Sequence, residues 1–140
     1  MGAGWVISSV TELEDASGQA WDKGICPTSG LGTGGTAITF DSAGDVVVGG
    51  TTVDPINLGG GPMTAPTATN DPFVVKYAPD GTYQWARRFF NDWDDHASGV
   101  ATDSSGNVLA VGDTTAGLDL GAGLLVNHGG GAGWIVKLHS

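Results

Sequence analysis

The chain has 140 residues, 25 of them glycine, and 15 acidic residues against five Lys and Arg give it a formal net charge of −10. This charge disfavours nucleic acid as a partner, because a nucleic-acid-binding surface is basic. No apolar run reaches the roughly 18 residues of a membrane-spanning helix. The glycines lack a G-X-Y period, which excludes collagen, and a hydrophobic content of 40% is enough for one globular domain.

Short apolar runs separated by turn residues predict an all-β fold. Residues 37–40 and 46–48 are rich in β-branched side chains, and the polar link between them supplies turn chemistry. Three segments rich in Gly and Pro, at residues 24–35, 54–71 and 121–133, are predicted to be loops. No window keeps the i, i+3, i+4 apolar stripe of a helix.

The chain contains an internal repeat of 62 residues. Residues 36–61 align without gaps with residues 98–123, and the sequence DSAGDV in the first copy lies over DSSGNV in the second. This alignment divides the single domain into a partial repeat (1–35), a full repeat (36–97) and a second partial repeat (98–140), each full unit having four strands. The pairs of glycines that recur are predicted to be the corners between strands: Gly44 and Gly106, Gly50 and Gly112, Gly59 and Gly121, Gly61 and Gly123.

The flanking strands also recur. Trp5, Phe73 and Trp134 open three related segments, and Trp21 parallels Trp85. Recurrence at one repeat position indicates packing between units.

The unit resembles the bacterial cell-surface β-propeller repeat of large secreted proteins in myxobacteria and similar organisms. The segments that carry the resemblance are residues 73–77, 80–85, 99–103 and 106–112. It implies four-stranded propeller blades, about two per chain, and a secreted or cell-surface location, but no activity. Residues 20–35 depart from the pattern, and the N-terminus lacks the basic start and apolar core of a secretory signal.

Two blades are too few for a propeller, which has at least four. Two blades alone would expose sheet faces and strand edges that pair readily with another chain. We therefore expect a homo-oligomer in which two, three or four copies form a ring of four, six or eight blades.

The densest polar cluster comprises Asp92, Asp94, Asp95 and His96. Carboxylates suit Ca²⁺, Mg²⁺ or Mn²⁺, and a histidine extends the choice to Zn²⁺. In an extended segment Asp92, Asp94 and His96 would share one face. The segment is therefore either a divalent metal site or an acidic loop between blades.

Four individual residues are candidates for catalysis or binding. His96, beside three carboxylates, and His128, in a glycine-rich loop, are candidates for acid–base catalysis. Cys26 is the only cysteine, so it forms no internal disulfide, and we expect an ordinary thiol there. Trp93 lacks a counterpart in the other repeat and is a candidate platform for a sugar.

Three functions fit these features. The first is a non-catalytic propeller module for binding or surface display, which needs only the repeat. The second is a metal-dependent hydrolase of phosphate or ester substrates, in which the metal would activate water. The third is a lectin-like ring with one shallow sugar site per blade.

Overall fold

The computed structural model describes residues 21–25, 27 and 31–140, and within these residues the protein is all-β, as predicted. The strands are β1 (Thr33–Phe40), β2 (Val46–Thr52), β3 (Ile56–Asn57), β4 (Pro62–Met63), β5 (Asp71–Tyr77), β6 (Tyr83–Arg88), β7 (Asp95–Thr102), β8 (Val108–Thr114), β9 (Leu118–Asp119), β10 (Leu124–Leu125) and β11 (Ala132–Leu138). Within this described part, no helix is long and apolar enough to cross a membrane.

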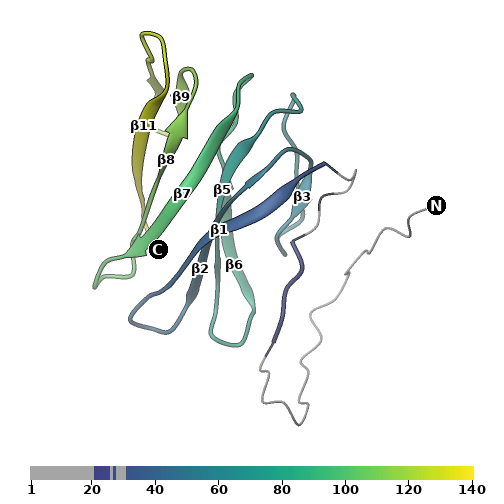
Figure 1. The fold of residues 1–140 in the computed structure, drawn as a ribbon. Coiled ribbons are helices and arrows are strands. Elements are labelled where there is room, and N and C mark those ends of the chain that lie inside the picture. Colours follow the sequence, from purple (N-terminus) through teal and green to yellow (C-terminus); the bar gives the residue numbers. More distant parts are fainter. Residues whose placement is uncertain (1–20, 26, 28–30) are drawn as a thin grey trace, which may run out of the picture.

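The seven longer strands form two antiparallel sheets, which lie side by side in Figure 1, and the four short strands form two further two-stranded sheets. The first sheet has four strands in the order β1-β2-β5-β6, and the second has three in the order β11-β8-β7. A short hairpin of β3 and β4 leaves the first sheet, and a matching hairpin of β9 and β10 leaves the second. The outer strand β6 therefore has no counterpart in the second sheet within the described residues.

The two sheets correspond strand for strand apart from β6. β7 to β10 begin 62 residues after β1 to β4, and β11 begins 61 residues after β5. The contacts recur as well: Asp41 Oδ1 accepts the backbone N–H groups of Ala43 and Asp45, and Asp103 makes the same two bonds in the second sheet. Both turns are therefore closed by an aspartate that satisfies the turn backbone.

The predicted loops contain more structure than expected. The hairpin of β3 and β4 lies inside residues 54–71, β10 lies inside residues 121–133, and β1 begins within residues 24–35. The first hairpin turns at Asn57, whose Oδ1 accepts the N–H groups of Gly59 and Gly61. Both glycines have positive φ, at 115° and 107°, so this turn needs residues without a Cβ.

One pair of recurring glycines is not at a corner. Gly50 and Gly112 lie inside β2 and β8, whereas Gly44 and Gly106 do take positive φ in turns. A Cβ on Gly50 would collide with the ring of Phe73 from β5, and one on Gly112 would collide with Trp134. The added Cβ would also meet a backbone carbonyl oxygen of the other neighbouring strand, that of Gly34 at Gly50 and that of His96 at Gly112, so both positions need glycine.

Each sheet has two faces, and the two sheets stack. We call the face that carries Phe73, Val75 and Tyr77 in the first sheet, and Trp134, Val136 and Leu138 in the second, the proximal face. The opposite face, with Val47 and Val74 in the first sheet and Leu109 and Ile135 in the second, is the distal face. The distal face of the first sheet packs on the proximal face of the second, and the main core lies between them.

A second core lies on the proximal face of the first sheet. It contains Val46, Ile56, Leu58, Phe73, Val75, Tyr77 and Ala86. Trp21 and Ile25 pack against it from the N-terminal side. The Trp21 ring lies 6.3 Å from the Tyr77 ring, and its Nε1 donates to the carbonyl oxygen of Pro79 over 2.9 Å.

Candidate functional site

The segment predicted to hold a metal is bent rather than extended. Asn91 Oδ1 accepts the backbone N–H of Trp93 over 2.7 Å, which closes a tight turn just before β7 begins at Asp95. Asp92 and Asp94 are exposed, whereas Asp95 is fully buried. The condition for a shared face, an extended backbone, is therefore not met.

The remaining side chains of this segment have partners of their own. Asp94 Oδ1 accepts both the backbone N–H and the side-chain amide of Asn70, each over 2.9 Å, and these bonds hold the pKa of Asp94 below its usual value. His96 Nδ1 lies 3.2 Å from Asp113 Oδ2 on the neighbouring strand. In the part of the chain that is described, no three His, Cys, Asp or Glu side chains form a group that could hold a metal.

The other candidates lie apart on the surface. His128 is exposed in the turn between β10 and β11, whereas His96 lies on β7 and its partner is Asp113. Trp93 is 60% exposed at the bend before β7. Cys26 falls outside the described residues.

A buried ionic cluster, which the sequence did not point to, joins the two sheets. Asp71 Oδ2 accepts a hydrogen bond from Arg88 Nε over 3.0 Å and forms an ion pair with Arg88 Nη2 at 2.8 Å. Arg88 also donates to the carbonyl oxygens of Asp54 and Met63. Next to Asp71, the backbone N–H of Asp95 donates to Asn70 over 2.8 Å. Asp71 and Asp95 are both fully buried, one in each sheet.

The two carboxylates in this cluster are under-satisfied. Asp71 Oδ1 and Asp95 Oδ2 are buried without a hydrogen-bond partner. Burial raises the pKa of Asp71 to about 6, with Arg88 opposing and Asp95 adding to the rise, and burial also raises the pKa of Asp95. Burial of the two carboxylates therefore favours their protonated forms.

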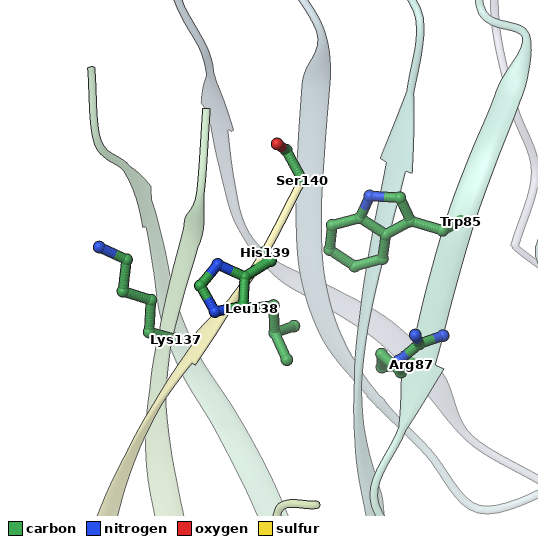
Figure 2. Close-up of a pocket in the computed structure, with 6 residues that line it drawn as sticks. All are labelled: Trp85, Arg87, Lys137, Leu138, His139 and Ser140. Atoms are coloured by element: carbon green, nitrogen blue, oxygen red, sulfur yellow. The ribbon is translucent and has the colours of Figure 1, made fainter. Parts of the chain in front are cut away.

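A groove of about 440 Å³ lies between β6 of the first sheet and the end of β11 in the second (Figure 2). Its lining residues are Trp85, Arg87, Lys137, Leu138, His139 and Ser140. Trp85 and Leu138 pack against the main core, yet Trp85 Nε1 is buried without a hydrogen-bond partner. The groove thus combines an apolar floor, cationic side chains and an unused donor.

No family model matches the chain, and no curated protein matches it. We therefore infer a function from the packing of the two sheets, the exposure of their faces and the groove between them.

Proposed function

We propose that the chain is a non-catalytic β-propeller-type repeat module for binding or surface display, and that it associates with further copies of itself. The support is the way in which one sheet covers the next. The distal face of the first sheet packs on the proximal face of the second. This contact leaves the distal face of the second sheet open at one end of the stack and part of the proximal face of the first sheet open at the other. A single repeat cannot bury its apolar faces by itself, so it needs neighbouring repeats to complete its core.

The observation that carries the proposal is the different exposure of equivalent residues. Val47 and Val74 on the distal face of the first sheet are fully buried by the second sheet. Their equivalents on the second sheet are Leu109, which is half-buried, and Ile135, which is 66% exposed. The distal face of the second sheet is therefore an exposed apolar surface. The equivalent face of the first sheet is covered, because the second sheet packs on it.

An ion pair on the same face repeats this difference. Lys76 Nζ lies 2.8 Å from Asp41 Oδ2, and the two side chains are 4% and 3% exposed. The equivalent pair, Lys137 and Asp103, has a similar separation of 2.7 Å but is 51% and 29% exposed. The ion pair thus has the same geometry in both sheets, but in the second sheet no neighbouring sheet covers it within the described residues.

The opposite end of the stack is open too. Ile38 and Phe40 on the proximal face of β1 are 62% and 63% exposed, whereas Val100, the equivalent of Ile38, packs into the main core. The two open ends are the two halves of one repeating contact. Such head-to-tail contacts make rings when the rotation closes, which is how four, six or eight blades would be completed.

Light scattering on the purified chain tests the proposal. We expect a mass that is a multiple of one chain, and we expect Ile135→Asp to reduce it because a carboxylate on the distal face cannot be buried cheaply. Leu124→Asp is the matched control, because Leu124 is equally exposed but lies on the β9–β10 hairpin. A wild-type chain that is monomeric at every concentration contradicts the proposal.

A second candidate function rests on Trp93. Trp93 is 60% exposed at a bend, and its neighbours in the sequence, Asp92 and Asp94, are exposed carboxylates. An exposed aromatic ring flanked by hydrogen-bond acceptors suits the apolar face and the hydroxyl groups of a sugar. The module would then display one shallow sugar site.

A further inference from the structure

In the described part of the chain, one edge of β11 is unpaired, and the first sheet shows how the equivalent edge of β5 is paired. There β5 pairs with β2 on one side and with β6 on the other, so both edges of β5 are hydrogen-bonded. β11 is the equivalent of β5 and pairs with β8, but within the described residues it has no strand on its other side. An unpaired strand edge is a site for an added strand.

The groove of Figure 2 lies beside this open edge. Lys137 and Leu138 of β11 form one wall, and Trp85 and Arg87 of β6 form the other. The buried Nε1 of Trp85 has no acceptor. The missing strand would run through this groove, with one edge toward β11 and one face toward β6.

Trp21 has the repeat position and the contacts of a residue on such a strand. Trp21 parallels Trp85 in the repeat, and Tyr77, against which Trp21 packs, is the equivalent of Leu138, which shares the groove with Trp85. Trp21 thus packs on the proximal face of the first sheet in the same way that Trp85 packs on the proximal face of the second sheet. Residues 21–25 therefore lie where the outer strand of a preceding sheet would lie.

We infer that the segment around Trp21 of one copy is the fourth strand of the second sheet in another copy, an assignment that rests on the proposed self-association. The second sheet of one copy then covers the open part of the proximal face on the first sheet of its neighbour. In the first sheet Lys76 pairs with Trp85 and Val74 with Arg87. The same register places Trp21 opposite Lys137 and Lys23 opposite Ile135 of the partner copy.

Charge and hydrogen bonding in the groove match this occupant. Between Trp21 and Lys23 lies Asp22, an exposed carboxylate. It takes the place of Ala86, whose side chain points to the proximal face of the first sheet. In the assembled sheet Asp22 points to Trp85 and Arg87 on the wall of the groove, where its carboxylate accepts hydrogen bonds from the guanidinium and from the unused indole N–H.

Disulfide trapping between copies tests the register. Lys23→Cys and Ile135→Cys are made in separate chains, both with Cys26→Ser so that the introduced thiols are the only ones, and the two proteins are mixed and oxidised. Directly opposed residues on paired strands are close enough for a disulfide. We expect several-fold more mixed dimer from this pair than from Lys23→Cys with Leu124→Cys, whose thiol lies on the hairpin.

Light scattering on the same samples separates this inference from the proposed function. If the copies associate but both cysteine pairs cross-link equally or not at all, the strand assignment is wrong and the association stands. If the wild-type chain does not associate, both are wrong.

A charge reversal provides a second test that does not depend on a thiol at the interface. Arg87→Asp should weaken association at least tenfold, because it places a carboxylate opposite Asp22. Asp22→Lys in the same chain should restore most of the loss. Failure of the second substitution to restore association overturns the pairing of Asp22 with Arg87.

Discussion

Val74 and Ile135 occupy the same position in successive sheets, yet Val74 is completely buried and Ile135 is 66% exposed. Val74 is covered because the second sheet packs on its face. The side chain of Ile135 projects from the same face of the second sheet, which has no cover in the described chain. A buried aliphatic side chain of this size contributes roughly 1.5 to 3 kcal/mol, so the open face leaves a substantial driving force for association.

The close contact between the sheets predicts that Gly49→Ala destabilises the protein. A Cβ on Gly49 would lie 2.8 Å from Val100 Cγ1 of the second sheet, closer than van der Waals contact permits. Overpacking of this kind costs roughly 1 to 3 kcal/mol. Thermal melting of Gly49→Ala beside Gly34→Ala, where nothing lies within 4 Å of the added methyl group, measures the effect. Equal melting temperatures for both variants would show that the sheets do not meet at Gly49.

The buried ion pair predicts a larger loss from Lys76→Met than from Lys137→Met. Lys76 lies between Asp41 and Asp45, and its removal leaves those carboxylates without their cation on a covered face. Breaking a buried pair costs about 3 to 5 kcal/mol, whereas an exposed pair contributes about 0 to 1 kcal/mol. Denaturant unfolding should be measured in an Ile135→Asp background, so that the distal face of the second sheet stays open. Comparable losses at both positions would contradict the burial of the first pair.

The carboxylates between the sheets predict an unusual dependence of stability on pH. Burial raises the pKa of Asp71 to about 6 in the folded chain, above its unfolded value near 3.8, so the folded state binds this proton more tightly. The stabilisation from this proton is complete below pH 3.8 and is lost as the pH rises through 6. Stability should therefore increase as the pH falls from 7 toward 4, by about 3 kcal/mol at most. Below that range the carboxylates whose pKa is lowered in the fold, such as Asp94 and Asp103, become protonated and stability falls.

Asp71→Asn isolates this contribution. The amide cannot take up the proton, so the gain in stability between pH 7 and pH 4 should shrink in the variant. Asp92→Asn, at an exposed position of the same charge, should keep the wild-type profile. A profile that is the same in all three proteins would exclude Asp71 as the titrating group.

The sugar-binding candidate predicts that Trp93→Ala abolishes binding to a glycan array and leaves the melting temperature within about 1 °C of the wild type. The ring is exposed, so its removal creates no cavity. Trp134→Ala is unsuitable as a control because Trp134 is part of the main core. Phe90→Ala, at another exposed aromatic residue, tests whether any surface ring is sufficient. Glycan binding that survives in Trp93→Ala, or is absent in the wild type, removes this candidate.

The sequence was informative where the structure depends on near neighbours. The turns at Asp41 and Asp103 are local, because each carboxylate bonds to backbone groups two and four residues further on. The all-β fold follows from runs of β-branched residues between such turns. The prediction that Gly50 is a corner is wrong, because the need for glycine there depends on Phe73, which reaches it only through the pairing of β2 with β5.

The candidate site was harder to predict for the same reason. Asp92, Asp94 and Asp95 are close in sequence, but the bend at Asn91 and the start of β7 send Asp95 inward and leave the other two in solvent. The buried cluster pairs Asp71 with Arg88 across two strands and brings Asp95 against it from the other sheet. The spacing of these three residues along the chain does not indicate that they lie together in the fold.

Amide hydrogen exchange along β11 tests the proposed self-association most directly. β5 is hydrogen-bonded on both edges, so its amides should exchange slowly at every concentration. If the exposed face and edge of the second sheet are completed by another copy, the β11 amides that point away from β8 should exchange as slowly as those of β5 in concentrated protein and markedly faster on dilution. Fast exchange of these β11 amides at all concentrations, while β5 remains protected, would contradict the self-association.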